Sequence, residues 1–212
     1  MNIKAVIFDL DGVITDTAPL HFKAWSKTVE KVGIKKLDHS YLDNLRGVGR
    51  VQSLEKILSS HNIKLNDDKF LYLLDYKNKY YIDLLSKIDK QAILPGITNF
   101  LKELKQNNIP IAIGSASHNT KLILEKVALT EYFDEIVDPS LVANSKPFPD
   151  IFLQAAKQLE IDPKNCVVIE DAITGIIAAR TAGCKTIGIN VEADIKLDST
   201  KKLNMKLLEK SF

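Results

Sequence analysis

The stretch AVIFDLDG, residues 5–12, is an apolar run that ends in two acids, Asp9 and Asp11, and a glycine. Short apolar runs bounded by turn residues are typical of strands that are buried on both faces of a sheet. We therefore predict a buried strand over 5–10 with a functional turn at its carboxyl end. Because Asp-X-Asp-Gly is also a common turn, the motif alone leaves its function open.

Similar apolar runs recur along the chain, and stretches with helical spacing of apolar residues separate them. Strands that alternate with helices favour a parallel sheet that is covered by helices on both faces. The predicted fold class is therefore α/β. The later strands are predicted at 109–113, 166–169 and 186–189, and the helices around them at 97–106, 120–128, 151–159 and 175–182.

The segment from 17 to 93 differs, because it has helical periodicity and no convincing strand. We predict one helix that begins near Pro19, a second around Leu54 and a third that is capped by Asn66. The simplest architecture is an α/β core that is interrupted after its first strand by an all-helical insert.

This pattern divides the chain into two parts. We predict an α/β core domain at 1–16 and 94–212, and a helical cap domain at 17–93. The chain would cross between them twice, side by side. Such a pair of crossings would form a hinge, so that the cap can open and close over the carboxyl edge of the sheet.

The composition is that of an ordinary globular protein, with 45% hydrophobic residues among 212 and a formal net charge of +2. This charge is too small to predict binding to nucleic acid or to a membrane surface. The two cysteines, Cys166 and Cys184, lie beside apolar stretches, which favours buried thiols over a disulfide. Acids interrupt the N-terminal apolar run, so we expect no signal peptide, no membrane span and a cytoplasmic location.

Polar side chains follow several predicted strands, at the edge where open parallel sheets bind ligands. Ser115 follows the second strand, Glu170 and Asp171 follow the third, and Lys146 precedes the helix that begins near 151. Each feature alone has an ordinary explanation, as a loop, a surface lysine or a helix cap. Four such features at one predicted edge are much less expected by chance.

These groups suit phosphoryl transfer, which requires positioning and charge neutralisation more than covalent work by the protein. Asp9, Asp171 and Glu170, with a backbone carbonyl, offer the oxygen ligands that Mg²⁺ prefers. The ion would offset the repulsion between an attacking carboxylate and a phosphoryl group, while the serine and the lysine hold phosphoryl oxygens. We predict Asp9 as the nucleophile and Asp11 as the general acid/base.

Four motifs resemble those of the haloacid dehalogenase-like (HAD) superfamily in order and spacing. They are FDLDGV at 8–13, GSAS at 114–117, Lys146-Pro147 and Glu170-Asp171. The resemblance covers the whole chain. It implies a HAD-like Rossmannoid core with a parallel sheet and an inserted helical cap, an aspartyl phosphate, and Mg²⁺ as cofactor.

Longer stretches are similar to the β-phosphoglucomutase branch of that superfamily. This resemblance implies interconversion of β-D-glucose 1-phosphate and β-D-glucose 6-phosphate, with glucose 1,6-bisphosphate as activator and intermediate. It also implies a small-molecule sugar phosphate as the partner, with no nucleic acid and no membrane, and we expect a monomer. The similar stretches are 8–18 with His21 and Trp25, LRGVGR at 45–50 with Ser53-Leu54, Lys77-Asn78, SASHN at 115–119 and SKPFPDIF at 145–152.

The same resemblance implies a role for each matching residue. Thr17 and His21 would set the position of Asp11, and Arg50 would bind the phosphate at the far end of the bisphosphate. Ser115, Ala116 and Lys146 would surround the transferring phosphoryl group, and Asp11 joins Asp9, Glu170 and Asp171 in the implied metal set. The other implied substrate contacts are Trp25, Leu45, Arg46, Gly47, Val48, Gly49, Lys77, Ser117 and Asn119.

Some positions depart from the family pattern. Arg46 stands where lysine is common, so the charge persists with a different hydrogen-bond geometry. His118 stands where lysine or arginine often occurs, and the stretch after Ile189 is shorter than in family members. His39 and His61 have no partner that the sequence identifies.

Other positions keep a purely structural alternative. Trp25 lies on the apolar face of its helix and fits a core as well as a pocket, and His21 fits an exposed position. Arg50 would be a surface charge by default, although the flanking glycines permit close approach of the backbone to an anion. For Tyr80 and Tyr81 we expect packing rather than stacking on a sugar.

Three functions remain open. In a sugar phosphomutase, a closing cap would protect phosphorylated Asp9 from water. A HAD-type phosphatase acting on a small sugar phosphate would need the same core motifs, and only His21, the segment 47–50 and Lys77 separate the two. A catalytically silent binding module is the least favoured, because all the acids needed for chemistry are present.

Overall fold

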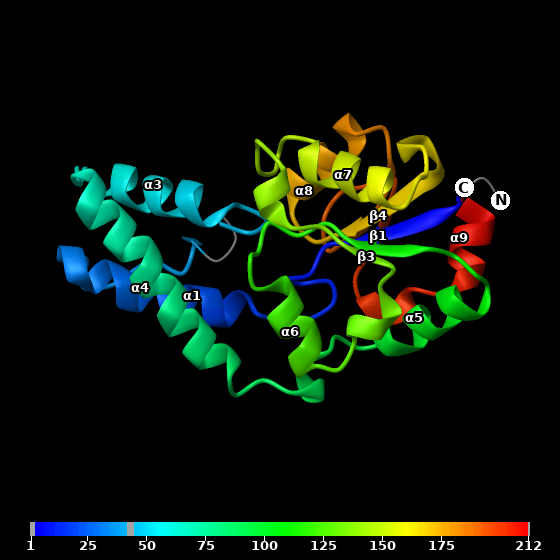
Figure 1. The fold of residues 1–212 in the computed structure, drawn as a ribbon, viewed down its shortest axis with the longest axis horizontal. Helices are drawn as coiled ribbons and strands as arrows, with labels where there is room; N and C mark the ends of the chain where they lie inside the picture. The colour runs from blue at the N-terminus through cyan, green and yellow to red at the C-terminus, as the bar shows by residue number, and fades with distance from the viewer. Residues whose placement is uncertain (1–2, 42–44, 212) are drawn as a thin grey trace.

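The computed structural model describes residues 3–41 and 45–211 and contains a six-stranded parallel sheet (Figure 1). The strand order is β3-β2-β1-β4-β5-β6, with β1 at the centre. The predicted α/β class with a parallel sheet is confirmed. The strands are β1 (Ala5–Phe8), β2 (Ile111–Ile113), β3 (Glu135–Ile136), β4 (Cys166–Glu170), β5 (Lys185–Ile189) and β6 (Ile195–Leu197).

Helices cover both faces of the sheet (Figure 1). Successive residues of β1 point to opposite faces, so Val6 and Phe8 enter one hydrophobic cluster while Ala5 and Ile7 enter the other. This is why the opening run has to be apolar without alternation. One face carries α5 (Ile97–Gln106), α6 (Thr120–Lys126) and α9 (Met205–Ser211), and the other carries α7 (Asp150–Gln158) and α8 (Ile173–Thr181).

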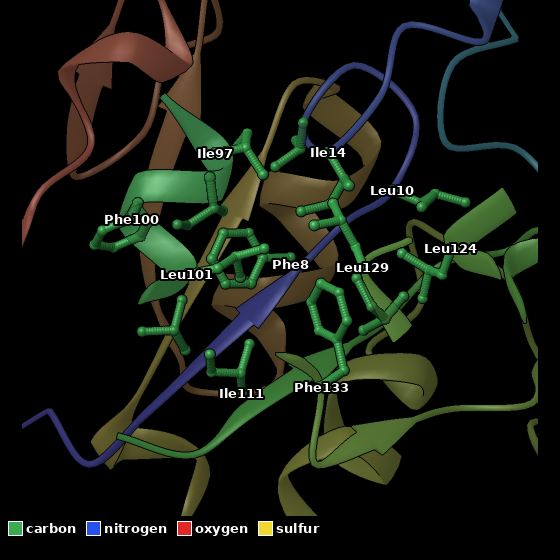
Figure 2. Packing of buried hydrophobic residues seen from close by; sticks show 14 of the residues in the cluster. Phe8, Leu10, Ile14, Ile97, Phe100, Leu101, Ile111, Leu124, Leu129 and Phe133 are labelled. Atoms are coloured by element: carbon green, nitrogen blue, oxygen red, sulfur yellow. The ribbon is translucent and has the colours of Figure 1, made fainter. Parts of the chain in front are cut away.

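The larger of the two clusters is built around Phe8 (Figure 2). Its ring packs edge-to-face against Phe100 of α5 and Phe133, with ring centroids 6.0 Å and 6.2 Å away. Edge-to-face pairs add about 0.5–1.5 kcal/mol to the free energy gained by burial. This packing holds the end of β1 rigidly, one residue before Asp9.

The helical insert lies beyond the carboxyl edge of the sheet (Figure 1). It contains α1 (Ala18–Val29), α3 (Arg50–Ser60) and α4 (Asp67–Leu85), which share a hydrophobic cluster around Trp25, Leu54 and Leu73. Pro19 lies in the first turn of α1, and the Asn66 side chain accepts a hydrogen bond from the Lys69 N–H at 3.0 Å. Both predicted helix starts are confirmed.

The two chain crossings between core and insert lie side by side, as predicted. The Leu94 N–H donates to the Ile14 carbonyl at 2.9 Å, and Thr15 forms an isolated antiparallel bridge with Ile93. Within the described part of 17–93 the structure has no named strand, in agreement with the sequence.

Element boundaries differ from the predictions in places. The predicted helix at 120–128 is shorter in the structure, where α6 ends at Lys126 and Ala128 has a positive φ of 55°. β3, β6 and α9 escaped prediction, since two- or three-residue strands and a terminal helix carry little periodicity. The 3₁₀ turns are Glu30–Val32, Lys90–Ala92, Thr130–Tyr132, Pro139–Leu141, Pro163–Asn165 and Thr200–Lys202.

Two further expectations concern the whole chain. Cys166 and Cys184 are buried and free, as predicted, and burial raises the pKa of both thiols. Among the described helices, none is long and apolar enough to cross a membrane.

Candidate active site

The predicted site residues meet at the carboxyl ends of the central strands. β1 leads directly to Asp9, β2 leads to Ser115, and β4 ends at Glu170. The parallel register places Phe8 beside both Ile113 and Ile169, so the residues after these strands are brought to one edge. The sheet therefore assembles groups that lie more than 50 residues apart in the sequence.

Lys146 is buried at the centre of this edge. Its Nζ donates to Asp9 Oδ1 at 2.5 Å and to Glu170 Oε1 at 2.7 Å. The two carboxylates raise the pKa of Lys146 above its ordinary value and outweigh the cost of burying the ammonium. The alternative of an ordinary surface lysine is therefore wrong.

Glu170 is held from two sides. Its Oε2 accepts the N–H groups of Asp171 and Ala172, both at 2.7 Å, at the start of α8. Both N–H groups precede Ile173, the first residue of α8, and the helix has no side-chain cap, so the helix-cap alternative is wrong for Glu170. Gly175 completes the arrangement, because a Cβ there would lie 1.8 Å from Glu170 Oε1.

Three acids form a potential metal centre. Asp9, Glu170 and Asp171 offer carboxylate oxygens that lie within 4.8 Å of one another. Burial raises the pKa of Asp9 to about 6, against the charge of Lys146 and with that of Glu170. Burial, and then the charges of Glu170 and Asp9, raise the pKa of Asp171 to about 8, although Arg46 Nη1 donates to Asp171 Oδ2 at 2.5 Å. This excess of negative charge and an all-oxygen donor set suit Mg²⁺. The Asp11 side chain is not part of this group of carboxylates.

Asp11 points instead toward the helical insert. Its Oδ2 lies 3.8 Å from His21 Nε2. Burial, and then the charge of Asp9, raise the pKa of Asp11 to about 7. A carboxyl group that gains and loses a proton near neutral pH suits general acid/base catalysis.

His21 is fixed by side chains of α4. Lys77 Nζ lies 2.8 Å from His21 Nδ1, and the Tyr81 ring packs on the imidazole with centroids 4.0 Å apart. Burial, and then the charge of Lys77, lower the pKa of His21 well below its ordinary value, so the ring is neutral. An ammonium can only donate to Nδ1, which leaves the proton on Nε2, facing Asp11.

Lys77 and Arg50 form a cationic end of the site within the insert. Burial, and then the charge of Arg50, lower the pKa of Lys77 to about 7, and burial also lowers the pKa of Arg50. Tyr81 is fully buried, as expected for packing, and its ring centroid lies 4.4 Å from Lys77 Nζ. This end carries positive charge that is poorly solvated, which favours an anion.

The segment 45–49 closes the pocket against α8. The Thr174 hydroxyl donates to the Arg46 carbonyl at 3.2 Å. Gly47 has φ +68°, and a Cβ there would lie 2.9 Å from Thr174 Oγ1. Glycine is required at this position both by the backbone conformation and by the close approach.

A pocket lies between core and insert and takes in most of the predicted site. Its lining includes Asp9, Asp11, His21, Trp25, Leu45, Arg46, Gly47, Val48, Arg50, Lys77, Ser115, Ala116, Ser117 and Asn119. The predicted residues outside the lining are Thr17, Gly49, Lys146, Glu170 and Asp171.

Several lining residues carried no assigned role from the sequence. They are Ala18, Phe22, Tyr41, Ser53, Asn78 and His118. Trp25 belongs both to the helical cluster and to the lining, so its two interpretations coexist. His39 stacks on Phe22 and His61 contacts the Ile57 carbonyl, and neither lines the pocket.

Comparisons with known proteins match this architecture. The sequence model of the haloacid dehalogenase-like hydrolase family matches residues 6–189. The chain is 41% identical to β-phosphoglucomutase of Bacillus subtilis (strain 168), an alignment that covers 99% of this chain and 96% of that protein. A crystal structure of β-phosphoglucomutase from Clostridium difficile matches with a TM-score of 0.95 and 39% identity, over 99% of this chain and 96% of the other. The phosphorylated carbohydrates phosphatase of Thermotoga maritima is 30% identical over 87% of this chain and 84% of its own length.

Proposed function

The chain belongs to the haloacid dehalogenase-like hydrolase family, and we propose that it interconverts β-D-glucose 1-phosphate and β-D-glucose 6-phosphate, the reaction of a β-phosphoglucomutase. The full-length similarity to the Bacillus subtilis enzyme supports the choice of reaction within the family. Glucose 1,6-bisphosphate is the proposed phosphorylating activator and intermediate. A monomer is the proposed functional unit.

One observation carries this proposal: the pocket has two ends of opposite electrostatic character. At the core end, Asp9 lies beside Lys146 and a cluster of acids. At the insert end, Arg50 and Lys77 are cations with lowered pKa values. A molecule with a phosphate at each end fits such a pocket, because one phosphate can react at Asp9 while the other neutralises the insert end.

The proposed reaction is a double transfer at Asp9. A phosphoryl group on Asp9 passes to the C6 hydroxyl of β-glucose 1-phosphate: the new O–P bond forms, the aspartyl O–P bond breaks, and Asp11 takes the hydroxyl proton. The resulting bisphosphate presents its C1 phosphate to Asp9. That phosphoryl group returns to Asp9, Asp11 gives its proton to the C1 oxygen, and glucose 6-phosphate leaves.

The residues around Asp9 prepare this transfer. Lys146 holds one carboxylate oxygen in place, and Ser115 with the neighbouring loop would bind phosphoryl oxygens. Asp9, Glu170 and Asp171 would hold Mg²⁺ through their carboxylate oxygens. When bound, Mg²⁺ neutralises charge between the carboxylate and the phosphoryl group.

We further propose that residues 17–93 act as a cap domain that hinges at the Ile14–Leu94 crossing. Closing the cap would exclude water from phosphorylated Asp9 and bring His21 to Asp11. Asp11 would then be held for catalysis only when a sugar phosphate is bound. A phosphatase could use the same core end, but it would have no need for cations at the insert end.

A turnover assay tests the proposal. Purified protein with Mg²⁺ and a trace of glucose 1,6-bisphosphate is offered either anomer of glucose 1-phosphate, and glucose 6-phosphate and free phosphate are measured separately. We expect glucose 6-phosphate from the β anomer in large excess over free phosphate, and little from the α anomer. Free phosphate as the only product would overturn the mutase in favour of a sugar phosphate phosphatase.

A further inference from the structure

A hydrogen bond between two asparagines spans the opening between insert and core. Asn119 Nδ2, in the core loop after β2, donates to Asn78 Oδ1 on α4 at 3.0 Å. The two residues lie 41 positions apart, and both line the pocket. No step of the proposed reaction uses Asn78.

The Asn119 side chain bonds to Asn78 and does not cap its own helix, α6. Asn119 is the N-cap residue of α6, yet its side chain forms no capping hydrogen bond. Asparagine is among the best N-cap residues, and such a cap is usually worth about 1 kcal/mol. The Asn119 side chain does not make this capping bond and instead bonds to Asn78 in the insert, which indicates that the contact with Asn78 has a role of its own.

The backbone beneath Asn119 is already fixed without Asn78. Ser117 Oγ accepts the Asn119 N–H at 3.3 Å, and the Thr120 hydroxyl donates to the Ser117 carbonyl at 2.7 Å. The contact with Asn78 therefore decides how the Asn119 carboxamide is turned. Because an amide has one acceptor and one donor group, engaging Nδ2 leaves Oδ1 as the acceptor for a sugar hydroxyl.

The position of Asn78 on α4 links this orientation to closure. It follows Lys77, which contacts His21, and it precedes Tyr81, which packs on the same imidazole. Arg46 and Thr174 form the contacts at the other edge of the pocket. The bond from Asn78 to Asn119 can therefore form only when α4 lies against the core.

We propose that Asn78 is a positioning residue, which orients the Asn119 carboxamide toward the sugar hydroxyls and fastens the insert over the pocket. The inference deepens the proposed function and rests on it for the identity of the sugar. It assigns to Asn78 a role in transfer to a hydroxyl rather than in the chemistry at Asp9. Losing the bond should therefore lower sugar transfer while leaving attack by water unimpaired.

The first test compares Asn78→Leu, which keeps the side-chain volume without the hydrogen bond, with the exposed neighbouring control Lys79→Ala. One neutral hydrogen bond corresponds to roughly a 2- to 12-fold change. We expect Asn78→Leu to lower kcat/KM for β-glucose 1-phosphate by this factor and to lower the ratio of sugar transfer to hydrolysis. Hydrolysis of acetyl phosphate should not fall, and Lys79→Ala should match the wild type.

A double-mutant cycle separates positioning from a general structural role. In protein that already carries Asn119→Ala, adding Asn78→Leu should cause little further loss, because the carboxamide that Asn78 orients is already absent. Asn78→Asp retains an acceptor for Asn119 Nδ2, so it should restore the ratio of transfer to hydrolysis. Additive losses, or failure of Asn78→Asp to restore that ratio, would overturn the proposal.

A measurement that uses no sugar keeps this inference distinct from the proposed function. In protein with ¹⁵N-labelled asparagine, saturated with Mg²⁺ and fluoroberyllate, the Asn119 side-chain amide should exchange with water faster in Asn78→Leu than in the wild type or in Lys79→Ala. Equal exchange rates in all three proteins would overturn the proposal that Asn78 holds the Asn119 carboxamide. Release of free phosphate alone by the wild type would overturn the mutase without altering this result.

Discussion

The two ends of the pocket are charged in opposite ways and are built differently. At the core end, Asp9 and Glu170 share Lys146, and burial raises the pKa of Asp9 to about 6 in spite of the lysine. At the insert end, Lys77 has a pKa lowered to about 7, and the buried Nε of Arg50 has no hydrogen-bond partner among the described residues.

This difference indicates what each end lacks. Buried carboxylates in excess are stabilised by a cation, and buried cations in excess are stabilised by an anion. The core end therefore suits a metal ion and an electrophilic phosphoryl group, whereas the insert end suits an intact phosphate. We therefore propose that the core end carries out the chemistry and that the insert end selects the acceptor of the phosphoryl group.

The largest expected effect comes from removing the nucleophile of the core end. Asp9→Asn keeps the shape of the side chain but cannot form the aspartyl phosphate. We expect kcat for both sugar transfer and hydrolysis to fall by at least about 10⁴-fold, in line with the loss of other essential nucleophiles. A folded variant, verified by circular dichroism, that retains turnover would contradict the role of Asp9.

Changing the insert end should separate the two activities. Arg50→Ala removes a charged hydrogen-bond donor, for which the expected loss is about 10- to 150-fold in kcat/KM for β-glucose 1-phosphate. Hydrolysis of acetyl phosphate, which needs only the core end, should change less than about threefold. Equal losses in the two assays would show that Arg50 does not serve a separate phosphate site.

The metal group at the core end can also be disturbed without replacing any of its three acids. Gly175→Ala introduces a methyl group that would lie 1.8 Å from Glu170 Oε1 and must displace that carboxylate. Disturbing the surroundings of metal ligands typically lowers affinity by 10- to 100-fold, so we expect a loss of about tenfold in Mg²⁺ affinity by calorimetry. Ile177→Ala serves as a control, because Ile177 is an exposed residue of the same helix, α8.

The smallest expected effect is on stability. Asp9, Asp11 and Asp171 have pKa values raised from 3.8 to about 6, 7 and 8. Between pH 4 and 8 the folded protein therefore holds protons that the unfolded chain has released, so these groups make stability fall as pH rises through this range. Without metal, Tm should drop on the order of 5 °C from pH 5 to pH 8.

Added Mg²⁺ should reverse this dependence. The ion favours the ionised carboxylates and competes with protons for them, so its stabilising effect should be larger at pH 8 than at pH 5. Thermal scans with and without Mg²⁺ at the two pH values measure this difference. An equal rise in Tm at both pH values would show that Asp9 and Asp171, the acids with raised pKa values in the predicted metal group, do not bind the ion.

Much of the architecture could be predicted from local patterns. The continuous apolar run 5–8 predicts a strand buried on both faces, and Pro19 and Asn66 predict helix starts that the structure confirms. The polar residues at the strand ends predict the core end of the site, because parallel strands bring their carboxyl ends to one edge. These features depend on near neighbours in the sequence.

Other features depend on contacts that no local pattern specifies. The pairing of Arg46 with Asp171 spans 125 positions, and a glycine at 175 is explained only by the nearby Glu170 carboxylate. Asn78 lies on a helical face beside Lys77, and only the closed arrangement brings Asn119 within reach. Sequence periodicity predicts which face of α4 is buried, but not which part of the core that face meets.

The central claim is that one molecule uses both ends of the pocket at once, and a binding measurement tests it most directly. With Mg²⁺, fluoroberyllate should occupy Asp9 as a phosphoryl analogue, and ¹⁹F NMR can follow the adduct while glucose 6-phosphate is added. We expect glucose 6-phosphate to bind to the adduct and to shift its resonances, and Arg50→Ala to retain the adduct while losing most of this binding. Displacement of fluoroberyllate by glucose 6-phosphate, or equal binding to wild type and Arg50→Ala, would contradict the account.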